Sequence, residues 1–508
     1  MTLHIGPTFS ALALRAFARY PQKTAFRSAS GSVTYSGVAD MMGRMQGVLS
    51  ACGIGRGDIV ALLSANRWET WCAGVAVQAL GAGVTYLHPM ASLDSHLYQL
   101  GDSGAALLIV DADVFLDRGA ELAAMSDKLA VLTLGAAGYG KNLFDLANKI
   151  GSVSPVDLSI GHEIGTLNYT GGTTGRPKGV VRTNAAGAHT TFSILADFEL
   201  PTQPRYLASA PISHVSGTNV LPTLLRGGSV HLLGKFDPEQ LMHTIEKERI
   251  NFSLLVPTMI YTLMDHPAFS RFDLSSIELL LYGASPMSPS RLAEGIERIG
   301  PVFSQLYGQS ECYPIAVLPK ADHDVKRPEL LSACGYPTTT SNVVLLDQDG
   351  NEVAMGEPGE ICVRAPHAMQ QYWQQPEQTR DAFAGGWLHT GDVARSDEQG
   401  RLYIVDRKKD MIISGGFNVY PREVEDVLTS HPAVSSAAVI GVADPKWGEA
   451  VQAVVVLKSE AVATADELMQ LVRQRKGPVL APKSVRFVDT LPVTPLGKVD
   501  KKALRAQS

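Results

Sequence analysis

The segment Tyr169-Thr-Gly-Gly-Thr-Thr-Gly-Arg-Pro-Lys-Gly179 combines glycines, threonines and one lysine, which are residue types that suit a polyphosphate. Glycines let backbone N–H groups approach phosphate oxygens, threonine hydroxyls can donate to them, and a lysine supplies compensating positive charge. The order is not that of a Walker loop, because Pro177 precedes Lys178 and Gly179 follows it. A flexible surface loop is the alternative. The succession of residues favours a polyphosphate-binding loop.

The same segment resembles a pattern of the adenylate-forming superfamily, which contains acyl- and aryl-CoA synthetases, the adenylation domains of peptide synthetases, and firefly luciferase. The family pattern is tyrosine or phenylalanine followed by T-S-G-T-T-G-x-P-K-G, and this chain departs from it at Gly171, where serine is usual. If that serine hydroxyl contacts phosphate, its loss removes a hydrogen bond worth ~1 kcal/mol. The resemblance implies that ATP is held by residues of this loop, with Thr173 also catalytic: Thr170, Gly171, Gly172, Thr173, Thr174 and Lys178.

The resemblance recurs in the family's order over nearly the whole chain. Near Tyr282, the string LLLYGASPMS is similar to the family's adenine-site segment. There Gly283, Ala284 and Ser285 would let the purine ring lie against the backbone. A turn of small residues without a function is the alternative.

The string Gln305-Leu-Tyr-Gly-Gln-Ser-Glu311 is similar to the family's Y-G-x-T-E. The match implies that Tyr307 stacks on adenine, beside Gly308. Ser310 would replace the usual threonine as a hydroxyl donor to phosphate, and Glu311 would hold Mg²⁺. The chemistry agrees with this role, because Mg²⁺ prefers a carboxylate plus nucleotide oxygens and neutralises charge on a departing pyrophosphate.

The string Trp387-Leu-His-Thr-Gly-Asp392 resembles the family's W-x-x-T-G-D, whose aspartate accepts hydrogen bonds from both ribose hydroxyls. An ionised carboxylate suits that task, because charge-assisted hydrogen bonds are shorter and stronger than neutral ones. In the family the arginine of the next string, Asp406-Arg-Lys-Lys-Asp410, also reaches ribose. The resemblance therefore implies that Arg407 binds ATP as well.

By the same resemblance, Lys409 falls on the hinge about which the C-terminal domain rotates. Gly415 and Gly416 would line a narrow tunnel for the pantetheine arm of CoA, since glycine admits close approach to the backbone. Near the end, LPVTPLGK resembles L-P-x-T-x-x-G-K, which implies that Lys498 bridges the substrate carboxylate and the α-phosphate. A placed cation there would offset the charge that builds up in the transition state. The expected small molecules are ATP, Mg²⁺ and CoA.

His214 lies where acid-activating CoA ligases carry a histidine beside the acyl pocket, and it is a candidate catalytic residue. A core histidine is the alternative. An amino-acid substrate is disfavoured, because no acidic residue between Arg205 and Asp237 could pair with its ammonium. The expected lining is small and uncharged, and suits an apolar aliphatic, cyclic or aromatic acid. By position it comprises His214, Ser216, Gly217, Thr218, Gly283, Ser285, Gly308, Cys312, Tyr313 and Pro314.

These residues predict an AMP-forming carboxylic acid:CoA ligase that works through an acyl-adenylate. One rival is a stand-alone adenylating enzyme that loads a carrier-protein thiol. Another is a non-catalytic nucleotide or acyl-CoA binding protein, which the retention of Glu311 and Lys498 disfavours.

The chain departs from the family pattern a second time at Leu480 and Ala481. Many relatives carry an aromatic–lysine pair at these positions, so its replacement here puts a CoA contact in doubt.

The elements that must position these residues follow an α/β pattern. Apolar runs such as DIVALLS and FSLLV alternate with helical stretches such as PEQLMHTIEKE, which is typical of βα units with buried parallel sheets. Short strands with turn signals predict a β-rich subdomain over about 341–406. We expect a large N-terminal adenylation domain of residues 1–407, followed by a small mobile α+β C-terminal domain, 408–508, with the catalytic lysine and the CoA tunnel face.

Composition narrows the class further. The 508 residues are 45% hydrophobic and 19% charged, and a net charge of -6 gives no reason to expect nucleic acid. The five cysteines are scattered and never in C-x-x-C spacing, so neither a disulfide framework nor a zinc site is suggested, and a cytoplasmic location fits best. The uncharged run Thr70–Leu93 contains Pro89 and predicts a buried helix and a strand rather than a transmembrane segment. The expected partner is a small-molecule carboxylic acid substrate, and the sequence leaves a homodimer open.

Overall fold

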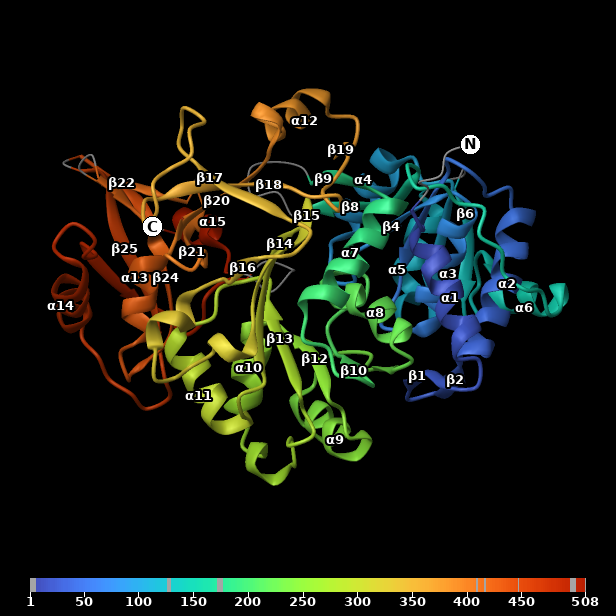
Figure 1. The fold of residues 1–508 in the computed structure, drawn as a ribbon, viewed down its shortest axis with the longest axis horizontal. Coiled ribbons are helices and arrows are strands. Elements are labelled where there is room, and N and C mark those ends of the chain that lie inside the picture. The colour runs from blue at the N-terminus through green and yellow to red at the C-terminus, as the bar shows by residue number, and fades with distance from the viewer. Residues whose placement is uncertain are drawn as a thin grey trace.

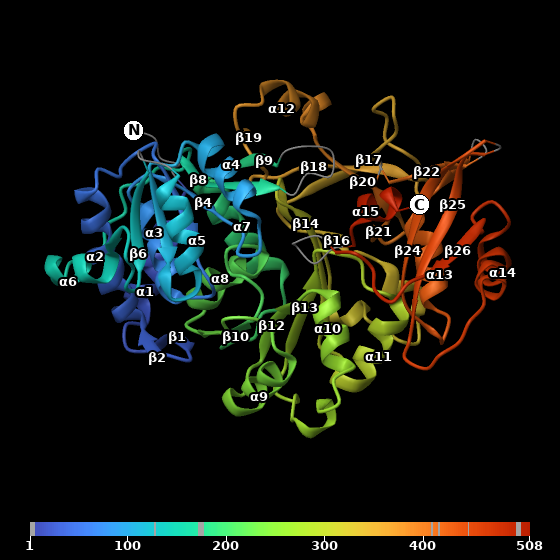
Figure 2. The same cartoon turned by 180° about the vertical axis from the view of Figure 1, so that it is seen from behind.

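Four sheets organise the chain in the computed structural model, which describes residues 6–125, 129–170, 177–407, 410–414, 417–445, 447–493 and 499–507. Figure 1 shows an eight-stranded sheet at the N-terminal side, a nine-stranded sheet through the middle, and a C-terminal sheet at the opposite side. Figure 2 shows the same succession from behind.

The nine-stranded sheet is parallel through its centre and antiparallel at its edges. Its central strands are apolar and buried, as expected for a parallel sheet covered on both faces. In sheet order the nine strands are β16 (Tyr336–Pro337), β15 (Cys312–Leu318), β14 (Phe303–Gln309), β13 (Leu279–Gly283), β12 (Phe252–Leu255), β10 (Arg205–Ala208), β11 (Ser229–Leu232), β1 (Thr24–Ser28) and β2 (Gly31–Thr34).

The eight-stranded sheet has a parallel centre with an antiparallel hairpin toward one edge. That hairpin, β8–β9, carries the glycine-rich loop at its tip. In sheet order the strands are β19 (Gln371–Tyr372), β9 (Lys178–Thr183), β8 (Ile164–Thr170), β4 (Gly83–Tyr86), β3 (Ile59–Leu63), β5 (Leu107–Asp111), β6 (Ala130–Leu134) and β7 (Lys141–Asn142).

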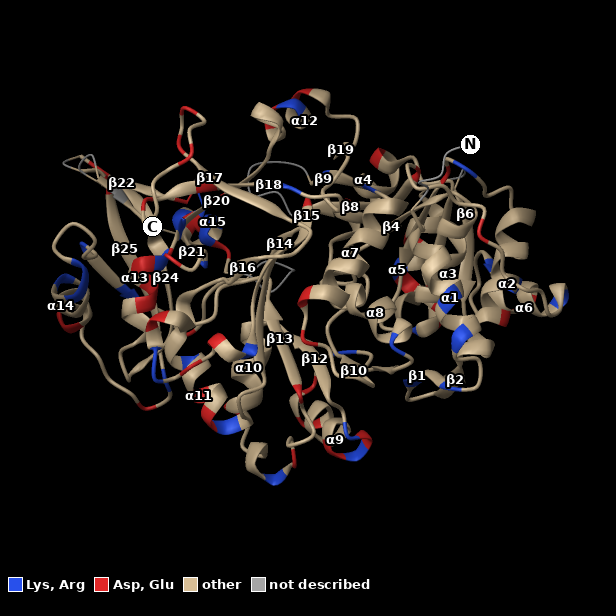
Figure 3. Cartoon of the chain, in the orientation of Figure 1, with Lys and Arg blue, Asp and Glu red and all other residues tan. Residues whose placement is uncertain are grey.

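Helices cover the sheets, and their ends follow local rules of capping. The Thr8 hydroxyl accepts from the backbone N–H of Ala11 at the start of the first helix, and Gly104, with φ +62°, ends the fourth. Acidic and basic residues are interspersed on the outer helices α9 and α11 (Figure 3). The helices are α1 (Phe9–Arg19), α2 (Tyr35–Ala51), α3 (Trp68–Ala79), α4 (Leu93–Ser103), α5 (Ala112–Ala124), α6 (Leu143–Ile150), α7 (Asn184–Asp197), α8 (Val220–Leu225), α9 (Pro238–Glu248), α10 (Pro257–Met264), α11 (Pro289–Ile299), α12 (Pro376–Ala382), α13 (Pro421–Thr429), α14 (Ala465–Lys476) and α15 (Lys501–Ala506).

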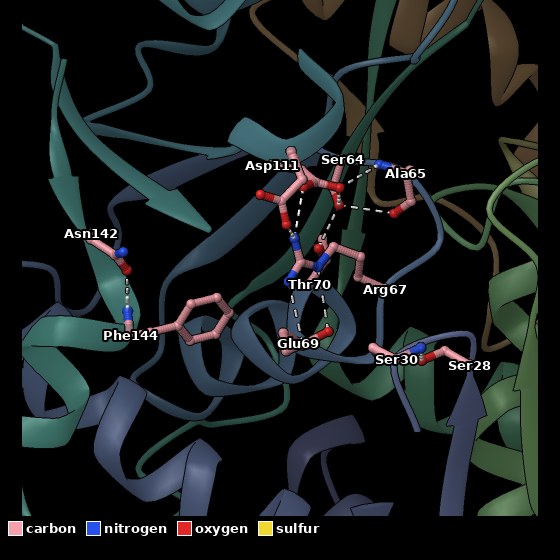
Figure 4. A network of polar contacts seen from close by, with 11 residues as sticks. Ser28, Ser30, Ser64, Ala65, Arg67, Glu69, Thr70, Asp111, Asn142 and Phe144 are labelled. Carbon is pink, nitrogen blue, oxygen red and sulfur yellow. Dashed lines mark hydrogen bonds and ion pairs between the residues drawn. The ribbon is translucent and has the colours of Figure 1, made fainter. Parts of the chain in front are cut away.

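A polar network ties the ends of β3 and β5 to the start of α3 (Figure 4). Arg67 donates to the fully buried carboxylate of Asp111 at 2.8 Å, and Thr70 donates to Ser64 at 2.6 Å. Ser64 in turn donates to Asp111 at 3.2 Å. Because every buried charge here has a partner, the network fixes the carboxyl ends of two parallel strands at low cost.

A four-stranded antiparallel sheet follows the two large ones. The pairing of β18 with β20 is irregular between Glu360 and Cys362 of β18. Residues 390–392 of β20 form a β-bulge opposite this point. In sheet order the strands are β17 (Asn342–Leu346), β18 (Gly359–Arg364), β20 (Leu388–Ser396) and β21 (Leu402–Arg407).

The C-terminal sheet has a hydrophobic core of its own, which includes Ile412, Val439 and Val455. Helices α13 and α14 pack together beside it. Its strands are β23 (Phe417–Val419), β22 (Ile412–Ser414), β25 (Gly448–Leu457), β24 (Val434–Asp444) and β26 (Ser484–Phe487). A separate core is what a C-terminal domain requires. The boundary near residues 407–408 remains a prediction, since residues 408 and 409 lie outside the described part.

The predicted α/β class is confirmed, with large parallel sheets, a β-rich subdomain and a small C-terminal α+β part. The uncharged run Thr70–Leu93 forms the rest of α3 and then β4, as predicted. Among the residues that the structure describes, no helix combines the length and apolar character needed to cross a membrane.

Candidate active site

The glycine-rich loop connects two paired strands. Thr170 at the end of β8 lies opposite Lys178 at the start of β9, and Tyr169 lies opposite Gly179. The hairpin therefore fixes both ends of the predicted phosphate loop. The predicted ATP ligands Gly171, Gly172, Thr173 and Thr174 lie outside the described residues.

Helix α4 and Trp373 hold the base of this loop. Asp102 accepts from the Tyr169 hydroxyl at 2.5 Å and from the Tyr98 hydroxyl at 3.3 Å. The Trp373 indole donates to the Asp102 carbonyl at 2.9 Å, and its backbone N–H donates to the Gly179 carbonyl at 2.7 Å. A Cβ atom on Gly179 would lie 3.0 Å from that of Trp373, so a larger residue would crowd this clamp. The fold thus anchors the base of the loop from two segments that are distant from it in sequence.

Tyr372 connects the loop lysine to the predicted metal carboxylate. The Nζ atom of Lys178 lies 4.8 Å from the centre of the Tyr372 ring, whose hydroxyl donates to Glu311 Oε1 at 2.9 Å. Burial and the Glu311 carboxylate raise the pKa of Tyr372, so its hydroxyl keeps its proton and remains a donor. Sequence reasoning missed Tyr372, which only the pairing of β19 with β9 brings here.

Glu311 occupies the tight turn between β14 and β15, beside Ser310. Its side chain is half-buried, and its carbonyl accepts from Met369 N at 2.6 Å. A carboxylate oxygen fixed by its backbone and by Tyr372, and close to a lysine that can contact phosphate, is the hard oxygen donor that Mg²⁺ prefers. The residues present therefore fit the predicted metal.

The predicted adenine segment lies at the carboxyl end of β13. Gly283 pairs with Leu306 of β14, and a Cβ atom on it would lie 2.4 Å from the Leu306 carbonyl oxygen. Ala284 follows with φ +65°. Only glycine fits at position 283. The strand ends in a turn at Ala284, and Ser285 follows along the chain. The close approach of β14 thus explains Gly283, and the positive φ of Ala284 turns the backbone where the purine is expected.

Tyr307, Asp392 and Arg407 form one cluster. The Tyr307 hydroxyl donates to Asp392 Oδ2 at 2.7 Å, and Arg407 Nε lies 3.3 Å from Asp392 Oδ1. Asp392 and Arg407 are also paired residues of β20 and β21. Burial and Asp392 raise the pKa of Tyr307 well above its usual value, so it stays a donor. The fold thus brings together three of the predicted ATP ligands.

The β-bulge of β20 presents Asp392. Gly391 has φ +72°, and its backbone N–H donates to Glu360 Oε1 at 3.0 Å. The Thr390 hydroxyl donates to the Ile361 carbonyl at 2.8 Å and accepts from Asp392 N at 3.1 Å. Glycine is required for the positive φ, which gives the T-G-D string a physical reason. Glu360 is a supporting residue that the sequence did not reveal.

His214 lies against a second histidine. Its ring centre is 4.6 Å from that of His88, edge to face, and its Nδ1 atom is 2.8 Å from the Ser213 hydroxyl. Burial, with a smaller contribution from His88, lowers the pKa of His214 to about 4. Burial and His96 lower the pKa of His88 too. Both rings are therefore neutral at pH 7. Sequence reasoning missed His88, which follows β4 and has no motif around it.

Several other residues of the predicted acyl pocket are closely packed against their neighbours. Gly217 follows His214 in the 3₁₀ helix Val215–Asn219, and a Cβ atom on it would lie 1.8 Å from the Ile212 carbonyl oxygen. Ser216 is fully buried, where its hydroxyl lies 2.7 Å from that of Tyr206. A Cβ atom on Gly308 would lie 2.9 Å from the Tyr313 ring.

Two pocket candidates at the β15 end, Cys312 and Tyr313, are buried, with Cys312 fully so. Thr218 is half-buried and donates to the Val215 carbonyl at 2.6 Å. The carbonyls of Tyr313 and Pro314 accept from Thr190 and His367, respectively. The part that each of these residues plays in the pocket stays a prediction.

The C-terminal residues of the predicted site fall largely outside the described chain. Lys409, Gly415, Gly416 and Lys498 are all in this group. Val493 and Val499, on either side of the lysine segment, form an antiparallel bridge. Ala481 is buried in the C-terminal core and Leu480 is partly buried against it.

Asp406 joins the two parts of the chain at the predicted hinge. Its carboxylate accepts from Arg407 N at 2.6 Å and from Arg422 N at 3.1 Å, and Arg422 belongs to α13. Burial raises the pKa of Asp406 to about 6, against the attraction of nearby Lys501. Lys501 itself lies 2.8 Å from Glu425.

Comparison with known proteins bears on the whole chain. The profile of the AMP-binding enzyme family matches residues 14–373, and that of the AMP-binding enzyme C-terminal domain matches residues 423–498. A medium/long-chain-fatty-acid–CoA ligase of Mycobacterium tuberculosis, FadD8, is 45% identical over 98% of this chain and 89% of its own length. A feruloyl-CoA synthase of an Amycolatopsis species is 37% identical over 96% of both. Among solved structures, the amide bond synthetase McbA from Marinactinospora thermotolerans has a TM-score of 0.91 and 36% identity, covering 98% of this chain and 99% of its own.

Proposed function

Because the chain belongs to the AMP-binding enzyme family, we propose that it joins an apolar carboxylic acid to CoA with ATP, through an acyl-adenylate, releasing pyrophosphate and AMP. The observation that carries this proposal is the arrangement of β14 and its turn. Tyr307, hydrogen-bonded to Asp392, lies on β14, and Glu311, hydrogen-bonded to Tyr372, lies in the turn directly after this strand. The strand and its turn would thus present a nucleoside-binding cluster and a polyphosphate-binding cluster in succession.

In the first half-reaction the acid's carboxylate attacks the α-phosphate of ATP. Asp392 and Arg407 hold the ribose, Tyr307 stacks on the adenine, and Lys178 and the loop threonines hold the polyphosphate. Lys498 offsets the negative charge that develops between two anions. Mg²⁺, held by Glu311, would supply further charge neutralisation on the pyrophosphate.

In the second half-reaction the CoA thiol displaces AMP from the acyl-adenylate. We assign the change of state to the C-terminal part, which would turn about Lys409, withdraw Lys498 and present Gly415 and Gly416 to the pantetheine arm. A hinge at this point agrees with the separate core of the C-terminal sheet, because each part can then move as a rigid body.

The acid itself is proposed to be apolar. His214 and His88 are both neutral at pH 7 and cannot pair with a second carboxylate of a substrate. The relatives named for fatty acids and for ferulate also act on acids with a large apolar or aromatic part. We favour a medium to long fatty acid or an aryl-substituted acid over a short dicarboxylate.

The deciding experiment measures CoA-dependent AMP formation with a panel of fatty, cinnamic, benzoic and alicyclic acids. At least one acid should give AMP and acyl-CoA in equal amounts, and omission of Mg²⁺ should suppress both. Absence of pyrophosphate release with every acid would overturn the proposal and favour a non-catalytic binding protein.

A second candidate is transfer of the activated acyl group to another nucleophile. The similarity to an amide bond synthetase favours testing it. Pyrophosphate release without any requirement for CoA in turnover, with an amide formed from an added amine, would support this candidate. Equal stimulation by a carrier-protein thiol, with none by CoA, would support carrier loading.

We also propose a reducing compartment such as the cytoplasm, since none of the five cysteines, all of which the structure describes, forms a disulfide, and four of them are buried. A homodimer is to be tested by light scattering on the purified chain.

A further inference from the structure

Glu360, Cys362 and His389 bring a carboxylate, a thiol and an imidazole together beneath the β-bulge that carries Asp392. We propose that these three residues form a binding site for a borderline-soft divalent cation of the Zn²⁺ type. Within the described part of the chain, one ligand atom from each lies within 4.8 Å of the other two. The site is separate from Glu311, the predicted Mg²⁺ ligand.

Strand geometry places the three side chains on one face of the small sheet. Glu360 and Cys362 are two residues apart on β18, and His389 is the cross-strand partner of Cys362 on β20. Cys362 Sγ lies 3.3 Å from His389 Nδ1, which lies 3.1 Å from Glu360 Oε2. Zinc bonds to these three atom types, at tetrahedral angles, place ligand atoms about 3.3–3.6 Å apart. Little movement is needed to bind a metal.

The hydrogen bonds of His389 leave a place for a cation. Its Nε2 atom lies 3.1 Å from the Ala384 carbonyl oxygen, which can only accept, so Nε2 carries a hydrogen. In the neutral ring, Nδ1 then carries a lone pair, 3.3 Å from Cys362 Sγ and 3.1 Å from Glu360 Oε2. That lone pair can accept from the Cys362 thiol, and it can bind a cation once the thiol gives up its proton. An imidazole oriented by a carbonyl on its far nitrogen is typical of metal-ligating histidines.

Charge and burial also favour a divalent cation. Cys362 is fully buried and Glu360 is 8% exposed, whereas the His389 side chain is 25% exposed and offers a route of entry. A thiolate and a carboxylate together carry two negative charges, which one divalent cation balances. Thiolate with imidazole selects zinc-like metals over Mg²⁺, which prefers oxygen ligands alone. A C-x-x-C spacing, which often indicates a zinc site in a sequence, is absent because these three ligands come from two strands.

A metal here would bear directly on the bulge. Glu360 Oε1 accepts from Gly391 N, so a cation on Oε2 would fix the carboxylate that holds the T-G-D turn. A metal that links β18 to β20 binds the folded state and not the unfolded state. Metal binding should therefore also raise the melting temperature of the protein.

The test is a Co²⁺ titration of the full-length, chelator-treated protein, followed by its absorbance. We expect one equivalent of Co²⁺ to produce a thiolate-to-cobalt charge-transfer band in the near ultraviolet, with visible bands of tetrahedral intensity. One equivalent of Zn²⁺ should abolish them. The bands should be lost in Cys362→Ser and retained in Cys52→Ser, which removes an exposed cysteine elsewhere.

The zinc-bound wild-type protein provides a readout that needs no variant. X-ray absorption should show one sulfur at about 2.3 Å and nitrogen or oxygen neighbours at about 2.0–2.2 Å. Absence of the charge-transfer band in the wild type would overturn the proposal. Survival of the band in Cys362→Ser would also overturn it. Both readouts are independent of ligase activity.

Discussion

The hydroxyl of Tyr307 donates to Asp392 Oδ2 at 2.7 Å, although the two residues are 85 positions apart. The side chain predicted to stack on adenine therefore also orients the carboxylate predicted to bind ribose. Arg407 contacts the other oxygen of the same carboxylate. The predicted nucleoside cluster is therefore held together by side chains of three strands, β14, β20 and β21.

Replacing Tyr307 with phenylalanine tests this relationship. A hydrogen bond to a charged group contributes roughly 1.5–3 kcal/mol, so we expect the KM for ATP to rise about tenfold or more, with a smaller change in kcat. Initial rates at varied ATP measure it. Tyr403→Phe is the matched control, since Tyr403 donates to Asp397 at 3.1 Å in the same sheet. An equal rise in the control would refute the assignment.

Glu311→Gln should impair adenylation through the metal. The amide keeps the shape but loses the charge, and we expect pyrophosphate release to fall about 100-fold or more and to require a higher Mg²⁺ concentration. Tyr372→Phe should shift the Mg²⁺ dependence in the same direction, but less. Glu329→Gln, at an exposed position, serves as the control. A Mg²⁺ dependence identical to wild type in both site variants would exclude the metal role.

Lys498→Ala should separate the two half-reactions. Acyl-adenylate formation should fall about 100-fold to 1000-fold, because a cation that stabilises transition-state charge is lost. Thioester formation from supplied acyl-AMP should remain largely intact. Lys502→Ala, which alters an exposed lysine of α15, should affect neither step. Equal loss of both steps in Lys498→Ala would contradict the proposed rotation of the C-terminal part.

Asp406 should make stability depend on pH in a defined window. Its pKa is raised from 3.8 to about 6, so the folded state binds more protons than the unfolded state between these values. Stability from this residue is therefore greatest below pH 4 and is lost as the pH rises through 6. Relative to Asp406→Asn, the wild type should lose on the order of 3 kcal/mol between pH 4 and 7.

Urea unfolding of both proteins across that range measures the Asp406 contribution, and taking their difference removes the other carboxylates. Asp349→Asn, at an exposed turn, should run parallel to the wild type. If the free energy of unfolding of the wild type depends on pH in the same way as that of Asp406→Asn, the buried charge of Asp406 is compensated and the prediction is wrong.

The neutral pair of His214 and His88 predicts the choice of acid. A second carboxylate buried beside them would lack a counter-charge, so we expect kcat/KM for a dicarboxylic acid to be at least about 100-fold below that for the monocarboxylic acid of equal length. The ratio should not change between pH 8 and 6, because the pKa of His214 is about 4. If the preference for the monocarboxylic acid is lost at pH 6, one of the two histidines gains a proton there and the prediction is wrong.

Much of this protein follows from local sequence. The strand Ile59–Leu63 has the apolar run of a buried strand, the helix Pro238–Glu248 has the pattern and the N-cap of a helix, and each forms as predicted. The T-G-D string also has a local cause, the positive φ of Gly391. Such features depend on a few neighbouring residues, so spacing and residue type suffice to predict them.

Only the tertiary structure decided which distant side chains meet. Tyr372 reaches Lys178 and Glu311 because β19 pairs with β9, and His88 reaches His214 because two different sheets pack together. Glu360, Cys362 and His389 converge through the register of β18 and β20. Sheet order and register are set by the packing of the whole core, so no short string of sequence encodes these contacts.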